Sequence, residues 1–139
     1  MRKNAQISIL VLIAIVHSFA FLYAWTYFGS AVLFSVGAAA DSYYLSVLAA
    51  TFATATIGTL PLAFLAGFIA RNFIGLTVLL FTFGWVAFNL YAGDLSTFSI
   101  KARLLPLLME LLAIAAYSFV FHRLGARVGP NYAIKGTSA

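Results

Sequence analysis

The chain has 139 residues, of which 64% are hydrophobic and 8% charged, and its mean hydropathy is +1.05. A soluble domain has about a quarter of its residues charged and about half apolar, and a chain this short cannot bury so much apolar surface in water. Cysteine is absent, which excludes disulfides, thiolate metal sites and cysteine nucleophiles. We therefore predict a single all-α integral membrane domain over residues 1–139.

Long apolar segments follow one another along the chain. We predict four transmembrane helices in an up-down bundle, with spans at about 7–28, 43–70, 73–91 and 104–122 and a polar, basic tail over 123–139. The first apolar run follows a basic start, but it is too long for a signal peptide and ends in bulky aromatic residues. Three interpretations of segment 29–40 stay open: a continuation of the first helix, an interfacial connection, or a re-entrant element.

The second span carries a ridge of small side chains at every fourth position, formed by Thr51, Ala55, Thr59, Ala63 and Gly67. This spacing places the ridge on one helix face, where the backbone of another helix can approach closely. Pro61 lies within the span and lacks an N–H, so the Ile57 carbonyl loses its helical partner and a kink is expected. The second span is therefore predicted to be the main packing helix of the bundle.

Short polar breaks define the other connections. Arg71 and Asn72 form the only break between the second and third spans, which makes these spans antiparallel neighbours. Residues 92–103 predict a loop, and Gly125 is expected to end the fourth helix. Asn89 is an intramembrane amide near the far end of the third span.

Basic residues are distributed unevenly over the two sides of this four-span arrangement. Arg2, Lys3, Arg71, Arg123, Arg127 and Lys135 lie on one side, whereas Lys101, Arg103, Asp41 and Asp94 lie on the other. Because basic residues are enriched on the cytoplasmic side, this asymmetry predicts that both termini are cytoplasmic, in the cell membrane of a prokaryote. A long basic run or a soluble basic domain is missing, so nucleic acid is a poor candidate partner.

Glu110 is the only acidic residue inside a predicted span. A carboxylate at that depth is unfavourable unless it is paired, neutral or hydrated. It can reach headgroup water, pair with Arg103, or face His17 in the first span, where a Glu–His pair can hold or pass a proton. We favour a structural role, in which Glu110 makes a polar contact with a neighbouring helix or a partner subunit.

His17 is a candidate haem ligand. The other histidine, His122, lies at the end of the fourth span, roughly 15 Å away along the membrane normal at 1.5 Å per residue. The two imidazoles therefore cannot clamp one haem within a single chain, and a haem ligated by His17 would need a second ligand from another subunit. A histidine hydrogen-bonded inside the bundle is the simpler interpretation.

The known catalytic signatures, such as a Gly-rich phosphate loop, HExxH or GxSxG, are missing from the sequence. We therefore predict a non-catalytic accessory subunit of a larger multisubunit membrane complex, with a respiratory or other redox complex suggested by analogy. The alternative is a small homo-oligomeric proton-coupled transporter or channel that uses Glu110.

The accessory-subunit interpretation also makes predictions about partners and cofactors. The expected partners are membrane lipids and other integral membrane subunits, or further copies of this chain in the alternative. No cofactor of its own is predicted, and a haem, quinone or pigment would be bound only at an interface with another subunit.

Overall fold

The computed structural model of this chain describes residues 3–40, 42–92 and 100–129, and these residues form helices and short connections without a strand. The elements are α1 (Lys3–Ala24), η1 (Trp25–Gly29), α2 (Ser30–Ala40), α3 (Tyr43–Gly58), α4 (Leu60–Ile69), α5 (Ile74–Ala92) and α6 (Ile100–Val128). The prediction of an all-α fold is confirmed.

The first three elements form one continuous helical rod. The rod changes to π-helical geometry at η1, where the Ser30 N–H donates to the Trp25 carbonyl, and returns to α-helix in α2. Neither proline nor a charged residue interrupts this stretch, so the helix continues well past residue 28, the predicted end of the first span. Segment 29–40, for which three interpretations were open, is helical.

The second rod consists of α3 and α4. Ser42 caps α3, since its side-chain oxygen accepts a hydrogen bond from the Leu45 N–H at 3.4 Å. The rod is divided at Thr59, two residues before Pro61, which lies in the first turn of α4. Proline is tolerated in a first helical turn because its missing N–H has no helical partner there.

The second half of the chain differs from its predicted boundaries. A tight turn joins α4 to α5, with the Phe73 N–H donating to the Ala70 carbonyl at 2.9 Å. α6 begins at Ile100, so residues 100–103 are helical rather than part of the predicted loop, whereas residues 93–99 lie outside the described residues. The prediction that Gly125 ends the last helix is wrong, because α6 continues to Val128.

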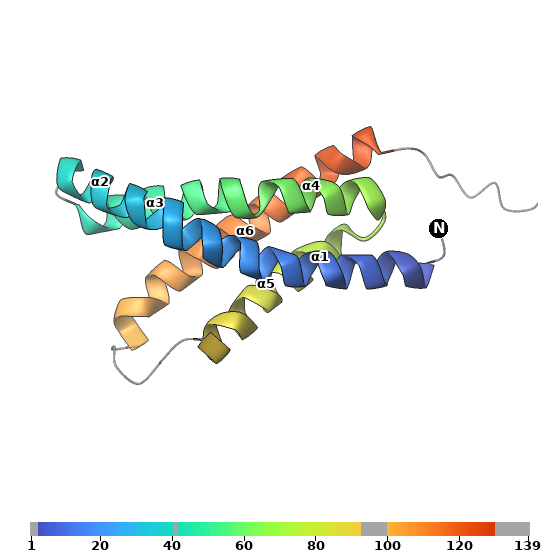
Figure 1. Cartoon of the computed structure of the whole chain (residues 1–139), viewed down its shortest axis with the longest axis horizontal. Coiled ribbons are helices and arrows are strands. Elements are labelled where there is room, and N and C mark those ends of the chain that lie inside the picture. Colours follow the sequence, from blue (N-terminus) through green and yellow to red (C-terminus); the bar gives the residue numbers. More distant parts are fainter. Residues whose placement is uncertain (1–2, 41, 93–99, 130–139) are drawn as a thin grey trace, which may run out of the picture.

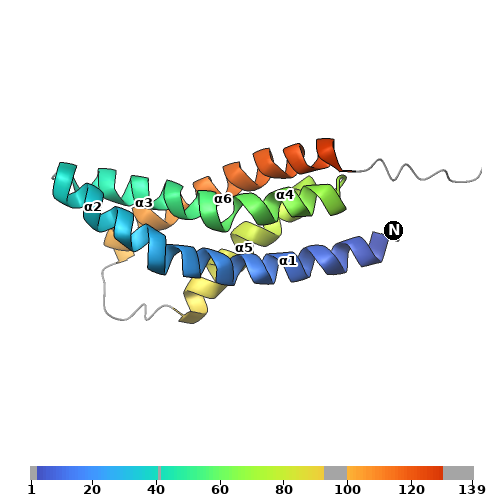
Figure 2. The ribbon, with the colours of Figure 1, turned by 45° about the horizontal axis from the view of Figure 1, so that its top comes forward.

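Figures 1 and 2 show how the rods alternate in direction. α1 runs away from the N-terminus, α3 and α4 return alongside it, α5 leaves again at an angle, and α6 returns beside α4. The start of α1, the α4–α5 turn and the end of α6 therefore gather at one end of the bundle. A hydrogen bond from Gln6 Nε2 to the Ile69 carbonyl, 3.2 Å long, joins the first two of these segments.

The closest approach between helices is between α4 and α6, which share the most extensive contact in the fold. A Cβ on Gly67 would collide with the carbonyl of His122, and a Cβ on Gly125 would collide with the carbonyl of Phe64. Each helix thus contributes one glycine against the backbone of the other. This packing explains why α6 continues through Gly125: the glycine serves a helix crossing rather than a helix end.

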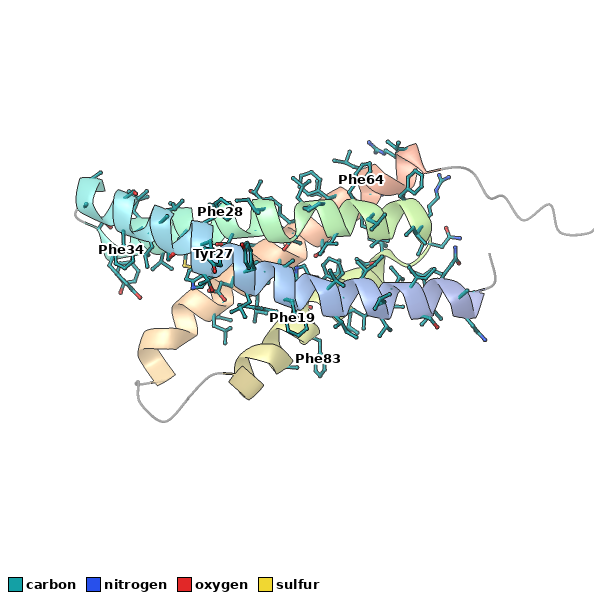
Figure 3. The ribbon with its side chains drawn as sticks, in the orientation of Figure 1. Phe19, Tyr27, Phe28, Phe34, Phe64 and Phe83 are labelled. Atoms are coloured by element: carbon teal, nitrogen blue, oxygen red, sulfur yellow. The ribbon has the colours of Figure 1, made fainter. Side chains whose placement is uncertain are left out.

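Within the described residues, three helical stretches are long and apolar enough to cross a membrane: Lys3–Ala39, Tyr43–Ile69 and Leu107–Val128. The apolar stretch Ile74–Ala87 in α5 is shorter. Large apolar side chains project from the outside of the bundle, as Figure 3 shows for Phe19, Phe34 and Phe83. Such an exterior suits a hydrocarbon surrounding, in which apolar side chains need no burial.

Candidate functional site

His17 lies in the interior of the bundle and is fully buried. Its Nε2 is 2.9 Å from the hydroxyl oxygen of Thr59, so the histidine joins α1 to the break between α3 and α4. Its ring stacks on that of Phe81, with the centroids 4.1 Å apart and an interplanar angle of 16°. The imidazole is therefore held by a hydrogen bond on its edge and by an aromatic face from α5.

Glu110 is 8% exposed and accepts a hydrogen bond of 2.9 Å from Trp85 Nε1 at its Oε2 atom. This contact joins α5 to α6. Trp85 in turn packs against Phe21, with ring centroids 4.5 Å apart. The carboxyl group thus has a polar partner within the bundle, on the helix that precedes it in the chain.

The structure gives His17 and Glu110 different partners. No hydrogen bond joins the two side chains, although both belong to the described part of the chain. Phe21 contacts both the His17 ring and the Trp85 ring. Its aromatic ring therefore packs against His17 and also against the hydrogen-bond partner of Glu110. The side chains of Arg103 and Asn89 lie outside the described residues.

His122 is also fully buried, near the end of α6. Its Nε2 donates to the Arg71 carbonyl over 3.3 Å and so ties α6 to the α4–α5 turn. Within the described ranges, no group of three or more histidine, cysteine or carboxylate side chains is arranged to hold a metal ion. The Nε2 atom of His17, which a haem iron would take, is occupied by the bond to Thr59.

All members of the small-residue ridge are buried, namely Thr51, Ala55, Thr59, Ala63 and Gly67. Their neighbours come from both sides of the second rod. Thr59 contacts His17 of α1, and Gly67 lies against the backbone of His122 in α6. The ridge therefore lies between two helices rather than against one.

Sequence reasoning missed two residues of this interior. Trp85 was not expected to bind Glu110, although a buried indole usually needs an acceptor for its N–H, and that rule points to the nearest buried carboxyl group. The sequence predicts Gly125 as a helix end because glycine is common there. The sequence around Gly125 does not distinguish a glycine at a helix–helix crossing from a glycine at a helix end.

Two apolar grooves run along the outside of α1. One, of about 370 Å³, lies between α1 and α5 and includes Val11, Ile15, Phe19, Leu80 and Phe83 in its lining. The other, of about 670 Å³, continues along α1 and η1 and includes Phe19, Tyr23 and Tyr27. Phe19 belongs to both grooves, so they form one surface, here named the α1 face (Figure 3).

No protein-family model matches the chain, and no curated protein and no solved structure matches it either. The geometry therefore provides the basis for the functional interpretation. In the part of the interior that the structure describes, the ionisable side chains make hydrogen bonds between helices. Such contacts can stabilise a helix bundle and fix its register.

Proposed function

We propose that this chain is a small non-catalytic accessory subunit of a larger multisubunit membrane complex, with a respiratory or other redox complex as the candidate assembly. The observation that carries the proposal is the way in which His17 and Glu110 are hydrogen-bonded. Each is buried and bound to a side chain of another helix, Thr59 and Trp85 respectively. Polar groups engaged in this way hold the bundle together and require no substrate.

The α1 face supports the same proposal. It is a continuous apolar surface with aromatic side chains projecting from it: Phe19 is 61% exposed and Phe83 68% exposed. Apolar grooves lined by projecting aromatic side chains suit the side chains of a packed transmembrane helix, since helix association in lipid depends on van der Waals packing. We propose that an integral membrane subunit packs along the α1 face.

The test is gentle solubilisation from native membranes, followed by native mass measurement and identification of the co-migrating chains. The proposal predicts a large assembly that contains other integral membrane proteins. A small particle composed of this chain alone would contradict it and favour the alternative, a homo-oligomeric proton-coupled transporter that uses Glu110.

Glu110→Gln separates the two functions at residue level. Glutamine keeps an oxygen that can accept the Trp85 hydrogen bond but cannot carry a proton. For an accessory subunit, assembly is expected to survive this change. In the transporter alternative, proton flux into liposomes containing the purified chain would be lost. Proton flux by the wild-type chain alone, abolished by Glu110→Gln, would overturn the accessory role as a complete account.

A further inference from the structure

α2 and α3 form a helical hairpin at the end of the bundle away from the N-terminus (Figures 1 and 2). Within the described elements, α2 contacts only α3 and η1, and none of residues 30–39 is buried. The two helices are packed closely, since a Cβ on Gly37 would lie 3.2 Å from the Ser46 hydroxyl oxygen. We name α2 and α3 together the α2–α3 arm, and α1, α4, α5 and α6 together the base.

Both connections of the α2–α3 arm to the base pass through an irregular stretch of helix. In η1 the Ser30 N–H donates to the carbonyl of Trp25, five residues earlier, as in a π-helix. The other rod is divided at Thr59, and Pro61 has no N–H to donate to the Ile57 carbonyl. π-helical turns and prolines are the usual sites of helix kinks, and hinges consist of a few residues at the ends of elements.

These two irregular stretches lie side by side. A Cβ on Gly29 of η1 would collide with the Thr54 side chain of α3. Tyr27 of η1 and Ile57, two residues before the division at Thr59, line the same groove. A rotation about an axis through both stretches therefore moves α2 and α3 together, and each rod bends where its α-helical hydrogen bonding is already interrupted.

Contacts at the pivot and in the base fix the point about which the arm can rotate. Thr59 is bonded to His17 of α1 over 2.9 Å, and a Cβ on Gly58 would lie 2.9 Å from the Phe21 Cα atom. α1 therefore holds the division between α3 and α4 in place. On the base side, Gly67 of α4 lies against the backbone of α6, so α4 stays packed when α3 moves.

Tyr117 of α6 contacts α3 through two side chains. Its hydroxyl oxygen is 3.1 Å from that of Thr56, and its ring centroid is 6.4 Å from that of Phe52. The Thr56 hydroxyl donates to the Phe52 carbonyl over 2.8 Å, so the Tyr117 hydroxyl is the donor to Thr56. Both α3 side chains are exposed. Breaking this contact therefore leaves no deeply buried polar group unpaired, which keeps its cost low.

We propose that the α2–α3 arm is a hinged element that pivots at η1 and Thr59, with Tyr117 as the latch that holds it against α6. When the Tyr117 hydrogen bond is made, α3 lies against α6. When it is broken, the arm rotates away from α6 and the base keeps its packing. This conformational device is independent of the accessory role proposed above.

The experiment measures distances between two spin labels by double electron–electron resonance on the full chain in detergent micelles. The chain has no cysteine, so introduced cysteines are the only labelling sites. Phe34→Cys/Leu79→Cys places labels at exposed positions of the arm and the base, and Leu12→Cys/Leu79→Cys places both in the base. We expect two distance populations for the first pair and a single one for the second.

Variants of the latch and the pivot should change the populations of the first pair in opposite directions. Tyr117→Phe keeps the ring and removes the donor, so the ratio of the second population to the first should rise about two- to tenfold, as expected for one hydrogen bond. Thr56→Val should act alike, and the double variant should add little. Pro61→Ala supplies an N–H for the Ile57 carbonyl and should reduce the second population. Tyr44→Phe, at an exposed tyrosine of α3, is the matched control.

Three results would contradict the proposal. A single narrow distance for the arm–base pair, unchanged in Tyr117→Phe, would overturn the hinge. Equal effects of Tyr117→Phe and Tyr44→Phe would overturn the assignment of Tyr117 as the latch. A parallel change in the base pair would show that the whole bundle loosens, which contradicts rotation of the arm on a fixed base.

Discussion

Trp85 donates its indole N–H to Glu110 over 2.9 Å, and this bond joins α5 to α6 where Glu110 is 8% exposed. The two helices are consecutive in the chain, so the bond fixes their register directly. A buried acceptor that loses its donor is destabilising, whereas removal of both partners together is milder. This asymmetry makes the pair accessible to mutational analysis.

We expect Trp85→Phe to lower the free energy of unfolding in mixed micelles by about 1–2 kcal/mol, because the ring is largely retained and the donor is lost. Glu110→Met, which keeps a similar length without an oxygen, should also be destabilising. The double variant should lose less than the sum of the single losses. Additivity to within about 0.5 kcal/mol would show that the bond makes no energetic contribution.

The crossing of α4 and α6 predicts an unusual sensitivity to a single methyl group. Gly67→Ala and Gly125→Ala each place a Cβ against an opposing backbone carbonyl, so we expect each to lower the free energy of unfolding by about 1–3 kcal/mol. Gly75→Ala is the matched control, since a Cβ there meets nothing within 4 Å. Thermal unfolding in detergent should separate the variants. Equal behaviour of Gly67→Ala and Gly75→Ala would contradict the close approach.

The bond between His17 and Thr59 gives a third prediction. Thr59→Val keeps the shape and removes the hydroxyl, leaving the buried His17 Nε2 without this partner, and we expect a loss of about 1–3 kcal/mol. Thr59→Ser keeps the hydroxyl and should be milder. Thr82→Val serves as a control, because the Thr82 hydroxyl donates to carbonyls of its own helix. If Thr82→Val is as destabilising as Thr59→Val, the loss reflects threonine in general rather than the contact with His17.

The α1 face predicts which exterior positions matter for assembly. In Phe19→Ala/Phe83→Ala, both aromatic side chains of the α1–α5 groove are removed, and we expect less co-purification of partner subunits with an unchanged unfolding temperature of the isolated chain. Phe34→Ala is the control, since Phe34 is 75% exposed on α2, away from that groove. Unchanged co-purification in the double variant would place the partner interface elsewhere.

Several features of this fold follow from single residues of the sequence. Pro61 predicts an interruption because it lacks a donor, and the structure divides the helix at Thr59. The Arg71–Asn72 break predicts a tight connection, and the structure has a turn there. The π-helical turn Trp25–Gly29 does not follow from the sequence in this way, because nothing in these five residues distinguishes a π-helical turn from a helix end.

The candidate site was less predictable than the fold. Helix periodicity gives the face of a residue but not the rotation and crossing of the opposing helix. The depths of His17 and Glu110 therefore allowed a pair that the structure does not form. Whether His17 meets Glu110 or Thr59 depends on how α1 lies across the α3–α4 break, which is a tertiary property.

The length of the first rod can be compared with the thickness of a lipid bilayer. Its stretch Lys3–Ala39, which is 37 residues long, extends about 55 Å at 1.5 Å per residue, whereas the hydrocarbon core of a bilayer is about 30 Å thick. Even a tilt of about 40°, at the upper end for transmembrane helices, leaves a projection of about 42 Å. In a chain that spans a bilayer, we therefore expect α2 to lie at or beyond the headgroups on the side opposite the α4–α5 turn. The apolar length of the rod then exceeds the hydrocarbon thickness. A thicker bilayer would reduce this hydrophobic mismatch, and we expect α2 to lie deeper in such a bilayer.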